Sequence, residues 1–167
     1  DEKEVLFTSG ATESNNLAIK GAAYMYEKAP AGSANRGHVV SCIIEHKAVL
    51  DPCKRLQKEG FEVTYLDVDK DGLISLDELK AAKPPKTILI SVMYANNETG
   101  VLFPIKEIGQ IAKEKGVAFH TDAVQAAGKL PLEVERLQVD ALSAGAHKFY
   151  GPKGVGFLYL RSGTPFR

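Results

Sequence analysis

The 167-residue sequence has no tryptophan, only two cysteines and no excess of either charge. Basic and acidic side chains number 21 each, which argues against a nucleic acid, another polyanion or a membrane surface as a partner. No apolar run approaches the ~20 residues that span a bilayer. Two cysteines cannot form the disulfide framework of a small secreted protein, so we expect a reducing compartment and a cytoplasmic protein.

Both cysteines lie in apolar surroundings. Cys42 falls within the buried-strand pattern Val39–Ile44, and Cys53 shares the apolar face of a predicted helix. The sequence therefore predicts two packed thiols rather than two nucleophiles.

Apolar runs and segments with helical spacing alternate along the chain, which is about one domain long. The expected strands cover residues 5–8, 39–44, 61–65, 87–94, 117–119, 141–144 and 155–160. The first expected helix follows the small and capping residues 9–15 and has helical spacing over 17–28. The other expected helices cover residues 49–59, 75–83 and 104–115, with a short helix in the connector 130–140. This order predicts an α/β domain with a mostly parallel sheet and right-handed crossovers.

One segment matches a metal-binding pattern. Residues Asp67–Glu78 fit the calcium-loop spacing D-x-D-x-D-G, followed by five residues and a glutamate. In an EF-hand a helix enters this loop, whereas a strand pattern enters it here. We therefore predict a polar turn that ends a strand and caps a short helix, with a calcium-responsive binding module as the alternative.

The run 140–154 carries the clearest chemical signal. A buried strand over 141–144 ends in Gly145, His147 and Lys148, followed by a Gly/Pro turn. Open α/β sheets build their sites at the carboxyl ends of strands, and a buried lysine gives up its proton more readily. Such an amine can attack an aldehyde and form a Schiff base. A solvated loop lysine is the alternative interpretation of this stretch taken alone.

The other predicted strand ends also carry small or polar residues, namely Gly10-Ala11-Thr12, His46, Asn97, and Asp122 with Gln125. Because the carboxyl ends of parallel strands meet at one edge, we expect these residues to lie together with Lys148. The Gly/Ala/Thr turn precedes a helix, whose free N–H groups can bind an anion. Simple capping by Ser9 or Thr12 is the alternative there.

This set of side chains has a joint chemical meaning. A lysine can hold an aldehyde cofactor, and a carboxylate can keep a pyridine nitrogen protonated so that the ring accepts electrons. Amides can bond a phenolic oxygen, an imidazole can stack on the ring, and a helix amino terminus can bind phosphate. These are the components of a pyridoxal-phosphate site.

At these residues the sequence resembles the cysteine desulfurases, which belong to the class V aminotransferases among the fold-type I pyridoxal-phosphate enzymes. The matching motifs run in order over essentially the whole chain: Phe7–Leu17, Glu45-His46, Asn96–Gly100, His120–Gln125 and His147–Gly156. The resemblance implies a three-layer domain, with a mostly parallel sheet of the seven-stranded type and helices on both faces. It also implies that residues 1–167 form one pyridoxal-phosphate-binding large domain, with an amino-terminal segment and a small carboxyl-terminal domain missing.

The resemblance further implies roles for single residues. Lys148 would form the Schiff base and move protons, Asp122 would pair with the pyridine nitrogen, and His46 would stack on the ring. The remaining cofactor contacts would come from Asn97 and Gln125 to the phenolic oxygen and from Ala11, Thr12 and His147 to the phosphate. In the family, sulfur from L-cysteine passes to an enzyme cysteine, which leaves L-alanine and a persulfide for iron–sulfur clusters or thiolated tRNA.

Three departures from the family pattern stand out. Gly145 occupies a position where the family has a serine or threonine that bonds the phosphate. No cysteine matches the sulfur-accepting position, so we expect the fragment itself to be inactive. The substrate-carboxylate arginine and a phosphate contact from a partner subunit also lie outside the chain, and Arg161–Thr164 resembles that partner motif only in wording.

We therefore expect L-cysteine as substrate, sulfur-acceptor proteins as partners, and a homodimer for the full-length protein. The alternatives are a selenocysteine lyase, a serine or phosphoserine aminotransferase, or a scaffold domain that has lost its cofactor. The last of these is supported only by Gly145.

Overall fold

The computed structural model describes residues 1–26, 36–82 and 86–167. Its strands are β1 Val5–Thr8, β2 His38–Cys42, β3 Glu62–Leu66, β4 Thr87–Ser91, β5 Ala118–Asp122, β6 Ala141–Gly145 and β7 Gly156–Leu160. Its α-helices are α1 Ala11–Tyr24, α2 Lys47–Lys58, α3 Leu76–Ala81, α4 Ile105–Lys115 and α5 Val134–Leu137. Two 3-10 helices, η1 Glu2–Glu4 and η2 Ala146–Phe149, precede β1 and follow β6.

The seven strands form one sheet in the order β1-β7-β6-β5-β4-β2-β3. The pairs β2–β3, β2–β4, β4–β5 and β5–β6 are parallel, whereas β7 runs antiparallel to both β6 and β1. The prediction of a mostly parallel seven-stranded sheet is confirmed. Because β1 and β6 are both antiparallel to β7, they run in the same direction. The carboxyl end of β1 therefore lies at the same edge of the sheet as the carboxyl ends of β2 to β6.

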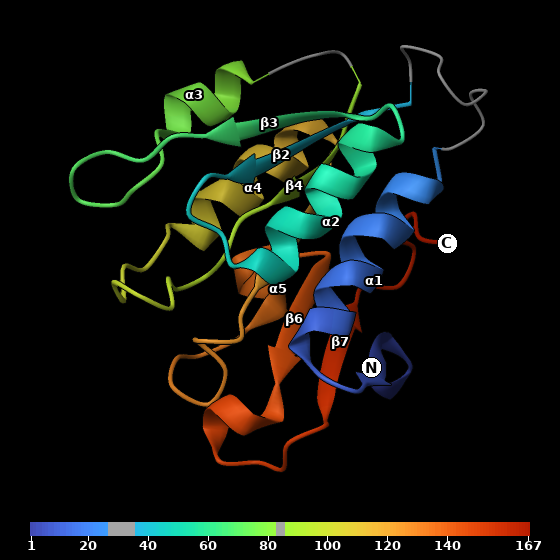
Figure 1. Cartoon of the computed structure of the whole chain (residues 1–167), viewed down its shortest axis with the longest axis vertical. Helices are drawn as coiled ribbons and strands as arrows, with labels where there is room; N and C mark the ends of the chain where they lie inside the picture. Colours follow the sequence, from blue (N-terminus) through green and yellow to red (C-terminus); the bar gives the residue numbers. More distant parts are fainter. Residues whose placement is uncertain (27–35, 83–85) are drawn as a thin grey trace.

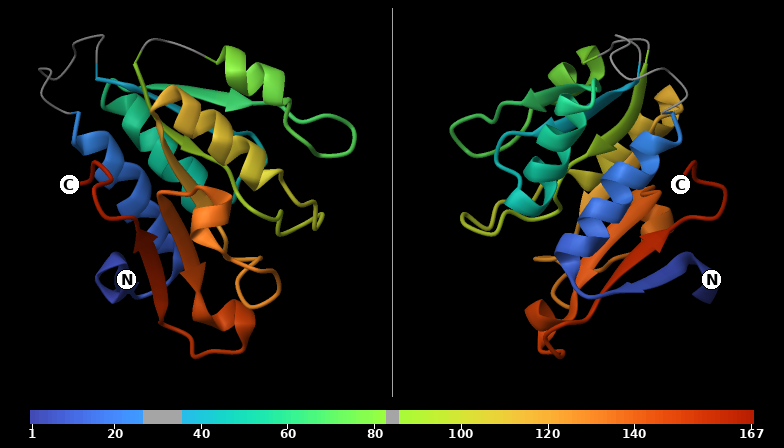
Figure 2. Two further views of the ribbon diagram at one scale, coloured as in Figure 1. Left: turned by 180° about the vertical axis from the view of Figure 1, so that it is seen from behind. Right: turned by 45° about the vertical axis from the view of Figure 1, so that its right-hand side comes forward.

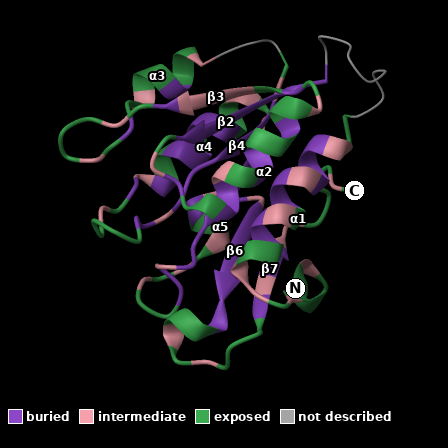
Figure 3. Ribbon diagram, viewed as in Figure 1, coloured by how far each residue is buried: buried purple, intermediate pink, exposed green. Residues whose placement is uncertain are grey.

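Helices cover both faces of the sheet. Helices α1 and α2 lie on one face, and α3, α4 and α5 lie on the other (Figures 1 and 2). The central strands are buried on both sides while the outer helix surfaces face solvent (Figure 3). Fully buried strands explain why their sequences read as continuous apolar runs rather than alternating ones.

Most predicted element types are correct, and their bounds differ by a few residues. The structure ends α1 at Tyr24, before the Lys28 that we predicted, and Lys28 and residues 29–35 lie outside the described residues. Gly116 adopts the left-handed conformation that ends α4, as predicted. Strand β5 extends to Asp122, so residues 120–122, which we predicted to follow the strand, belong to it.

The segment Asp67–Glu78 is a polar turn, as predicted. A β-bridge joins Val68 to Ile74, and one carboxylate oxygen of Asp69 accepts the N–H groups of Asp71 and Leu73. The Ser75 hydroxyl then caps α3. In the described parts of the chain, no three His, Cys, Asp or Glu side chains gather closely enough to hold a metal ion.

Among residues 1–26, 36–82 and 86–167, no helix combines the length and the hydropathy needed to cross a membrane.

Candidate functional site

The strand ends converge on a cavity of about 230 Å³. It is lined by Ala11, Thr12, Asn15, His46, Ala48, Met93, Ala95, Asn97, Asp122, Val124, Gln125, His147 and Lys148. Eight of the nine residues predicted for the site are therefore brought together. The ninth, Gly145, is buried at the end of β6, and a β-carbon placed on it would lie 3.2 Å from Ala11 Cβ and 3.3 Å from His147 Cε1.

Asp122 forms part of the cavity floor and is 6% exposed. Its Oδ2 accepts the Nδ2–H of Asn15 at 2.7 Å, and its Oδ1 accepts the backbone N–H of Val124 at 2.9 Å. Burial raises the pKa of Asp122, while these two N–H donors and the nearby His46 lower it. A carboxylate with N–H donors on both oxygens is a suitable partner for a positively charged ring nitrogen.

His46 marks the start of α2. Its Nδ1 accepts the backbone N–H of Ala48 at 3.1 Å and thereby caps the helix. A ring nitrogen that accepts this bond carries no proton, so the proton of the neutral imidazole lies on Nε2. The ring is exposed, and its attachment to the helix end fixes where an aromatic ligand could stack on it.

Lys148 is also exposed, on the short helix η2 beside His147. The expectation of a buried lysine is therefore wrong for the described chain, because η2 carries the side chain out of the sheet and onto the rim of the cavity. No hydrogen bond or ion pair ties the Lys148 ammonium to another described residue. Its amine is thus available to a ligand in the cavity.

The amino terminus of α1 lies at the other side of the rim. No side chain caps this helix end, so the predicted alternative of capping by Ser9 or Thr12 is wrong. The Ser9 hydroxyl and backbone N–H instead donate to Glu13 at 2.8 and 2.6 Å. Thr12 is exposed on the first turn, where uncapped N–H groups favour an anion.

The amides at the rim differ in their surroundings. Asn97 is exposed and Gln125 is half-buried. Asn96, which directly precedes Asn97, is buried and donates to Ile44 O at 3.1 Å, while its own oxygen accepts from Glu98 N and Thr99 N. Asn96 therefore holds the loop, and Asn97 faces the cavity.

Sequence reasoning missed two buried residues beside the site. Asn15 has no side-chain exposure, and its Oδ1 has no hydrogen-bond partner among the described residues. Glu45 is 5% exposed and lies just before His46. Asn15 follows Ser14 on the buried face of α1, so a polar pair on an otherwise small and apolar helix face was the signal that could have found it.

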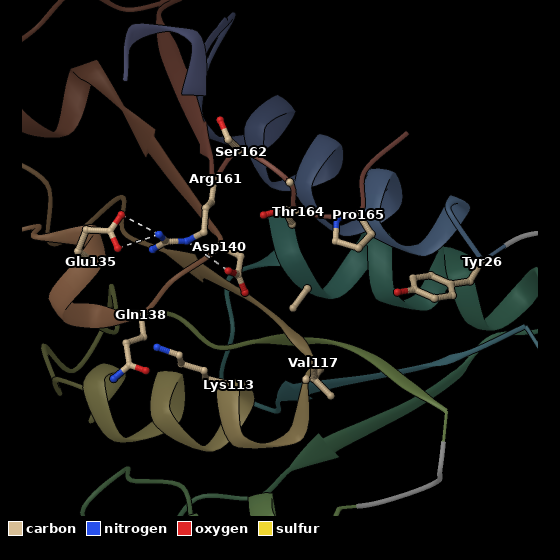
Figure 4. A pocket seen from close by; sticks show the side chains of 13 residues that line it. Tyr26, Lys113, Val117, Glu135, Gln138, Asp140, Arg161, Ser162, Thr164 and Pro165 are labelled. Atoms are coloured by element: carbon tan, nitrogen blue, oxygen red, sulfur yellow. Dashed lines mark hydrogen bonds and ion pairs between the residues drawn. The ribbon is translucent and has the colours of Figure 1, made fainter.

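A larger cavity, of about 430 Å³, lies at the amino ends of β5 and β6, away from the carboxyl ends that form the candidate site (Figure 4). Its arginine, Arg161, donates to both carboxylate oxygens of Glu135 at 2.7 and 2.8 Å. The guanidinium also lies 3.4 Å from Asp140 and donates to the carbonyl of Val139. These partners occupy the N–H groups of the guanidinium, so Arg161 stabilises the packing of this region and is not free to bind an anion. The likeness of Arg161–Thr164 to the family's partner-contact motif gains no support from this arrangement.

Comparison with known proteins gives a consistent family. The model of the family "Aminotransferase class-V" matches residues 1–164. The chain is 54% identical over 161 residues to "Cysteine desulfurase IscS" of Vibrio atlanticus and 57% identical over 159 residues to that of Anaeromyxobacter dehalogenans. These matches cover 96% and 95% of this chain, but 38% of each relative's length.

Solved structures agree with this result. A "NIFS-LIKE PROTEIN" superposes with a TM-score of 0.92 at 43% identity, covering 100% of this chain and 45% of the other. "SspA in complex with cysteine" superposes with a TM-score of 0.89 at 46% identity, covering 97% of this chain and 45% of the other. The chain thus spans less than half the length of these four proteins.

Proposed function

Because the chain belongs to the class V aminotransferase family, we propose that it is the cofactor-binding large domain of a pyridoxal-phosphate-dependent cysteine desulfurase. The observation that supports this most is the convergence of Lys148, Asp122 and His46 on one cavity from three separate strand ends. The identity of 54–57% to cysteine desulfurases supports the choice of reaction within the family.

The residues at the cavity fit the cofactor. Pyridoxal phosphate, when bound, supplies an electron sink that weakens bonds at the substrate's α- and β-carbons. Asp122, with N–H donors on both oxygens, would face the pyridine nitrogen. The uncapped first turn of α1 with Thr12, together with His147, would hold the phosphate.

Each rim residue then has a defined task. Lys148 would present the amine that holds the cofactor covalently and would move protons to and from the substrate. His46, fixed by its bond to Ala48 N, would stack on the ring. Asn97 and Gln125 would donate to the phenolic oxygen. Gly145 offers no hydroxyl to the phosphate, so a backbone N–H or a water would replace that contact.

The sulfur-accepting thiol cannot be either cysteine of this chain. Cys42 and Cys53 are both buried with 0% exposure. Burial raises the pKa of Cys42 to about 11 and that of Cys53 to about 12, so neither provides a thiolate near neutral pH. We therefore expect the isolated chain to release little or no alanine and sulfide from L-cysteine.

Other properties of the full-length protein stay predictions. The solved structure described as in complex with cysteine supports L-cysteine as substrate. Transfer of sulfur to acceptor proteins for iron–sulfur clusters or thiolated tRNA, homodimerisation and a cytoplasmic location follow from the proposed membership of the cysteine desulfurases.

The deciding experiment is to mix the purified chain with pyridoxal phosphate, record the visible spectrum, reduce with borohydride and map the modified peptide. We expect the label on Lys148, and its loss in Lys148→Ala. Lys153→Ala is the matched control, because Lys153 lies exposed in the following Gly/Pro turn and does not line the cavity. Label scattered over surface lysines in the chain and in any longer protein that contains it would contradict the proposal.

A further inference from the structure

Glu45 closes a gap between two neighbouring strands. Beyond the end of β4, Val92 N and Tyr94 N donate to His120 O and Asp122 O of β5. The intervening N–H of Met93 points to the other side, toward β2, whose last residue is Cys42. The Glu45 Oε1 accepts this N–H at 2.5 Å. The carboxyl group thus takes the place of a strand carbonyl where the ladder between β2 and β4 (Figure 1) has ended.

This contact joins the two loops that carry site residues. Glu45 directly precedes His46, and Met93 lines the cavity together with Asn97 further along the same loop. Asn96 makes a second connection between the loops, through its Nδ2–H to Ile44 O at 3.1 Å. The position of His46 relative to the floor of the cavity therefore depends on Glu45.

The Glu45 carboxyl is buried and has a single hydrogen-bond donor, the Met93 N–H, which is too little to hold a negative charge there. Its second oxygen, Oε2, is buried and has no partner among the described residues. A buried carboxylate with a single donor retains most of its desolvation penalty, whereas a neutral acid leaves one unpaired polar group. Asp122, by contrast, has an N–H donor on each oxygen. Of these two buried acids, Asp122 is built to hold the charge.

We propose that Glu45 is a positioning residue that acts as a neutral carboxylic acid, tying the His46 loop to the end of β4 and leaving Asp122 as the single negative charge of the cofactor site. The role of the Asp122 charge in binding a cofactor rests on the proposed function. A second negative charge at Glu45 would favour protonation of Asp122 and so weaken its pairing with a positively charged ring nitrogen.

The surrounding titratable groups are consistent with this. Burial, followed by the charge of Asp122, raises the pKa of Glu45 well above its usual range. The other groups that face Glu45 are Cys42 on β2 and Cys53 on α2, whose pKa values burial raises to about 11 and about 12. Both thiols are neutral below pH 9, and His46 next to Glu45 is exposed. A pH effect between 5 and 8 that disappears with Glu45 would therefore belong to Glu45 or to its coupling with Asp122.

The test compares Glu45→Gln with Glu45→Ala, with the exposed Glu107→Gln as control. Melting temperatures of the cofactor-free protein are measured from pH 5 to pH 8. An acid with a raised pKa stabilises the fold below its unfolded pKa and loses that contribution as pH rises toward the folded pKa. We expect the melting temperature of Glu45→Gln to rise relative to wild type with pH, by up to about 3–5 °C per pH unit. Glu107→Gln should show no such trend.

Cofactor binding is the second readout. Glu45→Gln keeps an acceptor for the Met93 N–H, so its affinity for pyridoxal phosphate should stay within about threefold of wild type. Glu45→Ala, which leaves that N–H unpaired, should bind at least about tenfold more weakly. A Gln variant that loses the cofactor, or that melts parallel to wild type at every pH, would overturn the inference. If wild type itself fixes no cofactor on Lys148, the proposed function fails, and the melting curves still decide the charge of Glu45.

Discussion

His120 provides a sharp test of how the site's floor is built. It lies in the middle of the sheet with 0% exposure, two residues before Asp122 on the same face of β5. Its Nδ1 bonds the Ser91 hydroxyl of β4, and its Nε2 bonds the Ser143 hydroxyl of β6, both at 2.9 Å. Burial lowers the pKa of His120 from 6.5 to about 3.

The sign of the pH effect follows from this lowered pKa. The unfolded chain binds a proton at His120 below pH 6.5, whereas the folded chain does not until about pH 3. The stability that His120 contributes is therefore fully present above pH 6.5 and is lost as pH falls toward 3. At ~1.4 kcal/mol per pH unit, the loss over this interval has an upper limit of about 5 kcal/mol.

The perturbation is His120→Asn, which keeps a hydrogen-bonding side chain but cannot titrate. Urea unfolding at pH 7, 6, 5 and 4 gives the free energy of unfolding for wild type and variant. The difference between the two should shrink as pH falls, because only wild type has this proton to bind on unfolding. His147→Asn serves as control, since His147 is exposed. Parallel curves for wild type and His120→Asn would show that burial does not lower the pKa of His120 in the folded chain.

Three further predictions concern the site and the thiols. Asn15→Ala removes the side chain that donates to Asp122 at 2.7 Å. Because a hydrogen bond to a charged group contributes ~1.5–3 kcal/mol, the affinity for pyridoxal phosphate should fall about tenfold or more. An absorbance titration measures this affinity, and an unchanged value would contradict the prediction. Gly145→Ser adds a hydroxyl beside the proposed phosphate position. Its β-carbon would lie 3.2 Å from Ala11 Cβ, a tight contact that a shift of a few tenths of an ångström relieves. We expect tighter cofactor binding and a stability change within about 1 kcal/mol, whereas weaker binding would show that the position has no room. Cys42 and Cys53 should resist a thiol reagent in the folded chain and react fully in urea; rapid labelling without denaturant would show that they are not packed as described.

The sequence predicts the fold well because residues within or next to each helix and strand indicate its type and its ends. Strands buried on both faces appear as apolar runs, and Gly116 marks the end of α4. What fails is the burial of Lys148, because the sequence does not show that η2 turns the lysine away from the sheet. The sequence also predicts Asp122 after its strand, whereas Asp122 is the last residue of β5; polar residues at the end of a buried strand look like a loop.

The roles of Asn15 and Glu45 could not be predicted for a different reason. Each depends on a partner far along the chain: Asn15 bonds Asp122, and Glu45 bonds the backbone of Met93. Local propensity carries no information on such pairs, and a polar residue on a buried helix face or at a strand end has many possible partners. Only the three-dimensional arrangement identifies which one is used.

The cavity divides into a buried floor and an exposed rim, and this division has a chemical consequence. Asn15, Met93 and Asp122 in the floor are buried, so their hydrogen bonds and charge are fixed by the sheet and α1 before any ligand arrives. Thr12, His46 and Lys148 at the rim are exposed. The backbone N–H of Ala48 holds the His46 ring, whereas the side chains of Thr12 and Lys148 are held only when a ligand engages them. Preorganised charge is most effective where reorganisation is smallest. The floor is therefore where the electronic properties of a bound pyridine ring would be set, and the rim is where the ring, its phosphate and a substrate would be held in place.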